Sequence, residues 1–393
     1  MNKTKAIGNS AIVLYFIIGL EIMIMISPFA GFFYSVFNPF LLETAKYPAT
    51  RWLSSFFLPH MVVPPDDFLK FIRIMGSFLF VAGMAGFLIC ALQVYANKFM
   101  KKGTALKGLY SVIRHPQYVM LSISGIGLSI LWPRFLVVAL WLVMVLLYYF
   151  LSKDEERRML KDHPETYRDY MEKTGMFLPK KIESRLVPSS FGGKAVLFII
   201  LAAFTMGSAF FLRDFTVNHL PVWTDANVSA LAIMSEDMEK MEHRMPDILN
   251  LEEVRSHLKD GEHYLVYFLP ANYIMQGLIA DTGGDWKLYK QHHTISMITD
   301  WIFHPFRHLT EGHHSHHETS GHSTHSMADG IVRRLLFLRI ENVHIDKPAD
   351  LLSINARRVP VIMLDVEIHN MTVLDFKELP QDTGWGTVPT PAF

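Results

Sequence analysis

The amino-acid sequence predicts an α-helical multi-pass membrane bundle of about five spans, followed by a C-terminal soluble α/β domain. Half of the 393 residues are apolar and the mean hydropathy is +0.22, which is unusual for a soluble protein of this length. The apolar residues gather in long runs before residue 213. After that position the runs are short, and one of them alternates apolar and polar residues as a strand does.

The spans are predicted from segment length, since a bilayer core about 30 Å thick needs about 20 apolar residues in a helix. Two shorter segments are separated by Trp132-Pro133, so we expect a helical hairpin that turns at this proline. Gly76, Gly83 and Gly86 are expected to let a neighbouring helix pack closely. The five segments are 11–35, 71–95, 118–131, 135–151 and 195–212.

The orientation follows from the loops, because Lys and Arg favour the cytoplasmic side. The loop 97–115 holds five basic residues and the loop 152–194 holds ten, whereas 39–70 has three. We therefore expect a cytoplasmic N-terminus and an extracytoplasmic C-terminal domain. The expected organisation is a membrane domain at 1–193, the last transmembrane helix at 194–213 and the outer α/β domain at 214–393.

Within the outer domain, residues 228–259 indicate a helical segment in which Met234, Met238, Met241 and Met245 recur at helical spacing. Such a stripe is more typical of a packed helix face than of a copper site. Strands are indicated by alternation and by β-branched residues. The predicted strands are 263–269, 331–345 and 361–369.

A histidine-rich loop, 311–326, lies between the first two of these strands. Neutral imidazole binds zinc, copper and nickel, so the loop could hold a divalent metal. The spacing is loose, and a flexible loop without a selected metal is the open alternative. The candidate ligands are His313, His314, His316 and His317.

Charge and cysteine content exclude some classes of function. The formal net charge is zero, which argues against a nucleic-acid partner. Cys90 is the single cysteine, so the chain has no intramolecular disulfide. The sequence indicates no particular protein partner.

The first candidate site is the stretch 108–118, which reads Gly-Leu-Tyr-Ser-Val-Ile-Arg-His-Pro-Gln-Tyr. The residue before a proline is disfavoured in a helix, and proline suits the first helical turn. His115 is therefore expected at the mouth of a membrane helix, where free amides and the helix dipole favour a polar ligand. The alternative is that His115 only caps the helix.

A second polar block follows the predicted hairpin. Residues 154–160 read Asp-Glu-Glu-Arg-Arg-Met-Leu, and Tyr167, Tyr170 and Pro179 come after them. The block lies on the same side of the membrane as His115, and a carboxylate there could bind an ammonium group. A solvated charge cluster is the alternative; it fits Glu155 equally well, whereas Glu156 favours the ligand role.

Together the two blocks resemble the isoprenylcysteine carboxyl methyltransferase and phospholipid methyltransferase superfamily of integral membrane enzymes, over about residues 70–180. The resemblance implies S-adenosylmethionine as methyl donor, with Glu156 as the residue that binds it. Tyrosine faces near a sulfonium contribute about 0.5–2 kcal/mol. The residues expected to form the cofactor site are Tyr110, Arg114, His115, Pro116, Gln117, Tyr118, Glu155 and Glu156.

Three positions depart from the family pattern: Met120 replaces a frequent glycine, Lys102 a histidine, and Ser152 an arginine. In the prenylcysteine enzymes that arginine is placed for the substrate carboxylate, so Ser152 argues against such a substrate. The expected acceptor is an amphipathic or lipid-like molecule that enters from the bilayer. No residue is a convincing general base, and the catalytic residues stay unassigned.

Two other functions remain open. A non-enzymatic protein that handles or senses metals would need residues 234–325 and would not need Glu156. A scaffold that kept the methyltransferase fold without activity is compatible with Met120 and Ser152. Binding of S-adenosylmethionine separates these alternatives from the enzyme.

Overall fold

The computed structural model describes residues 43–44, 46–59, 66–100, 108–271 and 332–379. The chain divides into two compact units. The helical unit comprises 1–18 and 67–214, and the sheet unit comprises 19–66 and 215–393. The first predicted span and the histidine-rich loop, with its four candidate metal ligands, lie outside the described residues.

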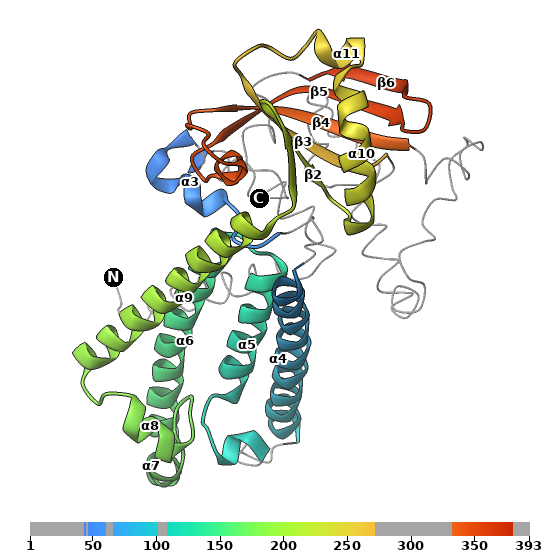
Figure 1. The fold of residues 1–393 in the computed structure, drawn as a ribbon. Coiled ribbons are helices and arrows are strands. Elements are labelled where there is room, and N and C mark those ends of the chain that lie inside the picture. Colours follow the sequence, from blue (N-terminus) through green and yellow to red (C-terminus); the bar gives the residue numbers. More distant parts are fainter. Residues whose placement is uncertain (1–42, 45, 60–65, 101–107, 272–331, 380–393) are drawn as a thin grey trace, which may run out of the picture. The chain divides into compact units, whose positions relative to one another are not determined.

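The helical unit is built around three long apolar helices, α4, α6 and α9, and a shorter helix, α5. Helices α4, α5 and α6 run side by side (Figure 1). The predicted hairpin is confirmed, since α5 ends and α6 begins on either side of Trp132-Pro133. The elements are α4 (Asp67–Phe99), η2 (Gly108–Ser111), α5 (Pro116–Leu131), α6 (Phe135–Asp162), α7 (Pro164–Lys173), α8 (Lys180–Leu186) and α9 (Phe191–His219).

Three described helices are long and apolar enough to cross a membrane: Asp67–Asn97, Phe135–Asp162 and Phe191–His219. Helix α5 has 16 residues, fewer than the 20 or so that a full span needs. Of the four spans expected within the described residues, three are therefore long enough to cross a membrane, which supports a multi-pass membrane protein.

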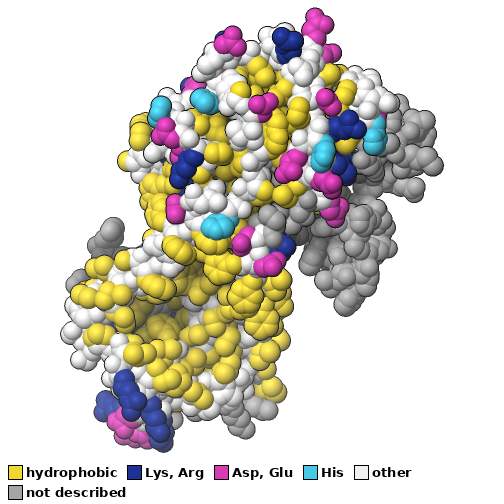
Figure 2. Space-filling view, viewed as in Figure 1, with side chains coloured by type: hydrophobic (Ala, Val, Ile, Leu, Met, Phe, Trp, Pro, Cys, Tyr) yellow, Lys and Arg dark blue, Asp and Glu magenta, His cyan; other side chains and the backbone are white. Residues whose placement is uncertain are grey.

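The outer surface of the helical unit is apolar. Leu92 on α4 is 67% exposed and Phe204 on α9 is 72% exposed, and many neighbouring apolar side chains are exposed with them. Figure 2 shows this surface, with Lys and Arg side chains gathered at the end where α7 and α8 lie. Contiguous apolar surface of this extent marks contact with lipid or protein, which is consistent with a place in the bilayer.

Glycines let α4 and α5 approach closely, as the sequence predicted. A Cβ on Gly83 would collide with the backbone of Met120 and Ser124. A Cβ on Gly127, from the other helix, would collide with the backbone of Phe80. Any larger residue at these positions must push the two helices apart, and the start of α5 would move with them.

Replacing Gly83 with Val is expected to lower the thermal unfolding temperature of the detergent-solubilised protein. Overpacking of this kind costs about 1–3 kcal/mol, and here the colliding atoms belong to backbone that cannot move aside. Gly207→Val on α9 is the matched control, because a Cβ there meets nothing within 4 Å. Equal melting temperatures for the two variants would contradict the close approach of α4 and α5.

The sheet unit contains a six-stranded sheet in the order β1-β2-β3-β4-β5-β6. Strands β2 and β3 are parallel, and all other neighbours are antiparallel. A parallel pair requires a crossover, which η3 (Ser235–Asp237), α10 (Met238–Leu249) and α11 (Glu252–Arg255) provide. The strands are β1 (Val222–Asp225), β2 (Val228–Ala232), β3 (His263–Pro270), β4 (Val332–Glu341), β5 (Arg357–Glu367) and β6 (Thr372–Glu378).

Both faces of the central strands are covered, so β2 and most of β3 are buried. Helix α10 lies across one face (Figure 1) and packs Met241 and Met245 into the core. The opposite face packs against η4 (Pro348–Leu352) and the chain that enters the sheet at Leu220. Helix α3 (Pro48–Ser54) belongs to this unit, where Arg51 Nη1 donates to the carbonyl of Asn355 at 3.0 Å.

The prediction of one helical segment over 228–259 was wrong at its start, because Val228–Ala232 forms strand β2. A short apolar run cannot be assigned to helix or strand by periodicity alone, and pairing with β1 and β3 decides it here. The packed methionine face of α10 and the alternation in β5 are confirmed, since Met245, Leu364 and Val366 are buried.

Candidate functional site

Four elements meet at the end of the helical unit where α5 begins: the segment 108–115, the last turns of α6, helix α7 and the loop 174–178. A backbone bridge joins Ile113 to Gly175. The amides of Arg114 and His115 donate to the carbonyls of Gly175 and Met176 at 2.8 and 3.1 Å. The loop therefore fixes the backbone of the Arg-His-Pro motif from outside that motif.

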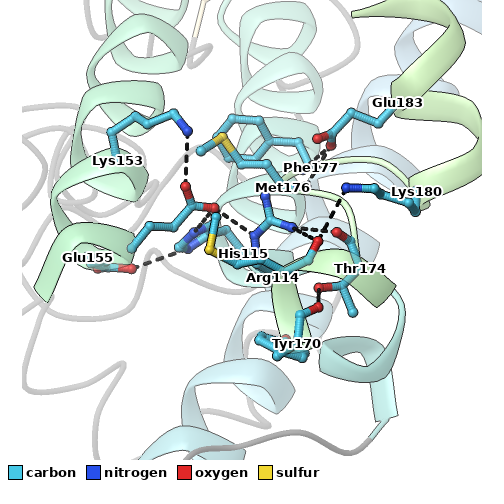
Figure 3. Close-up of polar contacts among 12 residues, drawn as sticks. Arg114, His115, Lys153, Glu155, Tyr170, Thr174, Met176, Phe177, Lys180 and Glu183 are labelled. Atoms are coloured by element: carbon cyan, nitrogen blue, oxygen red, sulfur yellow. Dashed lines mark hydrogen bonds and ion pairs between the residues drawn. The ribbon is translucent and has the colours of Figure 1, made fainter. Parts of the chain in front are cut away.

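His115 occupies the residue before α5, with Pro116 as the first helical residue, as the sequence predicted. His115 is thus the N-cap residue of α5, although its side chain makes no capping hydrogen bond. The ring is buried, with Nδ1 3.2 Å from Glu155 Oε2 and Nε2 3.7 Å from Glu156 Oε1. The imidazole therefore lies between the two carboxylates of α6, as Figure 3 shows for Glu155.

Arg114 and Glu156 form a buried ion pair. Arg114 Nε donates to Glu156 Oε1 at 2.6 Å, and the two side chains are only 6% and 4% exposed. Arg114 Nη1 also donates to the carbonyls of Met171, at 3.3 Å, and Thr174. The other carboxylate oxygen of Glu156 accepts from Lys153 Nζ at 3.0 Å. One side chain thus ties the Arg-His-Pro segment to both α6 and α7.

Three tyrosines make hydrogen bonds within the same site. The Tyr118 hydroxyl donates to Glu155 Oε1 at 2.6 Å, and its ring stacks on Tyr148 at a centroid distance of 4.8 Å. The Tyr110 hydroxyl donates to Gln117 Oε1 at 2.9 Å, and the Tyr170 hydroxyl donates to the Tyr110 carbonyl at 2.5 Å. Burial raises the pKa of Tyr170 to about 12, so this hydroxyl is a hydrogen-bond donor at neutral pH.

The structure brings the predicted residues into two adjoining groups. Arg114, His115, Tyr118, Glu155 and Glu156 form one connected polar network. Tyr110 and Gln117 form a second pair beside it, and Pro116 starts the helix between them. The geometry places these residues together, while their role as cofactor ligands stays a prediction.

Sequence reasoning missed the support from residues 174–183. Glu183 on α8 accepts three backbone amides, those of Met176, Phe177 and Leu178, at 2.6, 3.1 and 3.3 Å (Figure 3). These bonds hold the loop that carries the backbone of Arg114 and His115. The Phe-Leu-Pro sequence marked the region, but nothing in the local sequence distinguishes Glu183 from the other acidic residues nearby.

The described residues contain no group of three or more His, Cys, Asp or Glu side chains that could hold a metal ion. The predicted ligands His313, His314, His316 and His317 lie outside that part of the chain. The metal hypothesis therefore stays a prediction.

The charge on His115 is expected to make the site less stable as pH rises. Burial alone would lower its pKa, but the Glu155 and Glu156 carboxylates beside the ring outweigh burial and raise the pKa above 6.5. Because the folded-state pKa is raised, the stabilisation is fully present below about pH 6.5 and is lost as pH rises through the higher value.

We expect hydrogen exchange of peptides covering 113–119 to become faster between pH 6.5 and 8.5. The increase should exceed the one that the pH dependence of the intrinsic exchange rate accounts for. His115→Gln should remove this extra dependence. An identical corrected profile in both proteins would show that His115 is not the titrating group.

Comparison with known families agrees with the motifs. Residues 93–166 match the family model of phospholipid methyltransferases. This range contains every residue of the predicted cofactor site, and the match confirms the superfamily resemblance. No curated protein and no solved structure matches the chain significantly.

Proposed function

Because residues 93–166 match phospholipid methyltransferases, we propose that the chain is an S-adenosylmethionine-dependent integral membrane methyltransferase. Its acceptor is an amphipathic or lipid-like molecule. The observation that carries the proposal is the buried Glu156 carboxylate, which lies among cationic and aromatic side chains at the end of an apolar helical bundle.

The side chains present fit this cofactor. Glu156 offers a buried carboxylate to the ammonium of the amino-acid tail, and the stacked rings of Tyr118 and Tyr148 offer π-faces to a positive sulfonium. Ser152, one helical turn before Glu156, is fully buried, and its hydroxyl has no hydrogen-bond partner among the described residues. An orphaned buried hydroxyl is uncommon and supports a ligand beside it.

Bound S-adenosylmethionine supplies a methyl group on a positively charged sulfur. The chain contributes binding, orientation and exclusion of water. Arg114 fixes the position of Glu156, and Glu155 holds both His115 and the Tyr118 hydroxyl. Holding donor and acceptor in an aligned geometry accounts for much of the acceleration of such transfers.

The acceptor is proposed to reach the site from the bilayer. The site adjoins α4 and α5, and the exposed residues at this end of α4 include Tyr95 and Phe99, which are 59% and 82% exposed. An amphipathic acceptor could keep its apolar part along such a surface while its polar end reaches the buried polar network. Water-soluble acceptors would gain nothing from this surface.

The orientation is also a proposal. Residues 46–59 pack in the sheet unit, where Arg51 contacts Asn355, so both segments lie on one side of the membrane. The Lys and Arg content of the loops 97–115 and 152–194 favours a cytoplasmic site and an outer sheet unit. A reporter that is active only in the cytoplasm, fused after the last residue, should stay inactive; activity would reverse this orientation.

The function is tested with purified protein in nanodiscs made from a total lipid extract, supplied with S-adenosylmethionine carrying a tritiated methyl group. We expect tritium in the organic-soluble fraction with the wild type and none with Glu156→Gln. Binding of the cofactor without labelled lipid would contradict a lipid-like acceptor. Absence of both binding and label in folded protein would contradict the methyltransferase proposal.

A further inference from the structure

We propose that Lys153 occupies the place of the cofactor's ammonium group on Glu156, so that the free site is closed by the protein's own lysine. The inference rests on the proposed function and adds a residue that sets cofactor affinity. It predicts that removing this positive charge strengthens binding.

The two oxygens of Glu156 have different partners. Oε1 accepts from Arg114 Nε at 2.6 Å, and Oε2 accepts from Lys153 Nζ at 3.0 Å (Figure 3). Any ammonium group that binds this carboxylate must share or replace one of these contacts. Which of the two cations a ligand can replace depends on how firmly the protein holds each of them.

Arg114 is not replaceable. Its side chain is 6% exposed and donates to Glu156 and to two backbone carbonyls, those of Met171 and Thr174. Moving it from this position would break three contacts at once and leave a buried charge unpaired, which is costly. Arg114 therefore stays on Oε1 when a ligand binds.

Lys153 is held far more weakly. Its side chain is 45% exposed, and Glu156 Oε2 is its only polar contact in the part of the chain that the structure describes. The carboxylate is buried, but the lysine end of this pair, three residues away on the helix, is open to solvent, which weakens the attraction. The four-carbon stem of lysine is flexible, so Lys153 can rotate into solvent and leave Oε2 to a ligand.

The chemical match is direct, because lysine and the amino-acid tail of S-adenosylmethionine both carry a primary ammonium with three donors. Two ammonium groups on one oxygen repel each other. Binding must therefore release Lys153 first, and the observed affinity is lowered by the fraction of molecules in which Lys153 covers Glu156.

The experiment measures binding to the full-length, detergent-purified protein by calorimetry. The ligands are S-adenosylmethionine, S-adenosylhomocysteine and methylthioadenosine; the last carries the adenine, ribose and sulfur but no ammonium. Lys153→Met should bind the first two about two- to fivefold more tightly than the wild type, and methylthioadenosine with unchanged affinity. Lys153→Arg, which keeps the charge, should show no gain.

Lys161→Met is the matched control, because it removes one positive charge from the exposed end of the same helix. It should change none of the three affinities. Tighter binding of methylthioadenosine to Lys153→Met, or an equal gain in Lys161→Met, would overturn competition for Glu156. So would unchanged or weaker binding of S-adenosylmethionine to folded Lys153→Met.

Binding of S-adenosylmethionine to the wild type distinguishes a failure of this inference from a failure of the proposed function. If the wild type binds S-adenosylmethionine and Lys153→Met shows no gain, only the role of Lys153 fails. If no folded variant binds any of the three ligands, the proposed function fails and the role of Lys153 with it.

Discussion

Arg114→Met is expected to destabilise the helical unit by about 3–5 kcal/mol, the cost of leaving one partner of a buried ion pair alone. Arg114 contacts Glu156 on α6 and the carbonyls of Met171 and Thr174 at and after the end of α7. Its loss leaves a buried carboxylate that, among the described residues, pairs with Lys153 and lies near His115.

The change is measured as the thermal unfolding temperature in detergent, together with hydrogen exchange of peptides covering 171–178. Arg157→Met is the control, since Arg157 is 67% exposed and pairs with Asp154 at the surface. Such exposed pairs contribute about 0–1 kcal/mol. A similar loss of stability in both variants would contradict the buried ion pair as the link between these elements.

Asp237→Ala is expected to have an effect of the same size, about 3–5 kcal/mol, on the sheet unit. Asp237 ends η3 and accepts from Arg333 Nη2 on β4 at 2.7 Å, with side chains 3% and 5% exposed. Lys240 also contacts this carboxylate at 3.0 Å. The substitution leaves a buried guanidinium without its carboxylate.

Hydrogen exchange of strands β2 to β5 in the full-length protein measures this effect, and faster exchange throughout the sheet is expected. Combining Asp237→Ala with Arg333→Met should restore part of the loss, because replacing both partners of a buried pair costs less than removing one. An additive double variant would show that the two side chains do not stabilise the sheet unit as a pair.

Much of the helical unit could be predicted because the signals are local. Trp132-Pro133 breaks the apolar run, and α5 and α6 form on either side of it. Gly83 predicted close packing, and backbone atoms of α5 fill the space where its side chain would be. The number of complete spans was less certain, since α5 is apolar throughout but only 16 residues long.

The strands of the sheet unit could be predicted only in part from local sequence patterns. Strand β5 alternates in sequence and could be identified, whereas β2 is a short apolar run that is buried on both faces. Its strand conformation depends on β3, which is more than thirty residues away in the chain. Pairing over such distances is a tertiary effect that no window of sequence contains.

Some residues of the candidate site could likewise be predicted from the sequence, and others could not. Arg114, His115 and Glu156 could be chosen because two motifs lie at the ends of a helical hairpin, and the structure joins them. The contacts of Glu183 and Lys153 could not be predicted from the sequence. Glu183 binds backbone amides of the nearby loop, and the contact of Lys153 with Glu156 depends on a side-chain rotamer that no sequence pattern specifies.

The central claim is that Glu156 belongs to a binding site for S-adenosylmethionine. Calorimetric titration of the cofactor into detergent-purified wild type, His115→Ala and Glu156→Gln tests it most directly, with the exposed Glu165→Gln as control. We predict that the wild type and the control bind alike and that the other two bind at least tenfold more weakly, about 1.4 kcal/mol. Absence of binding by the folded wild type, or unchanged affinity in Glu156→Gln, would contradict the claim.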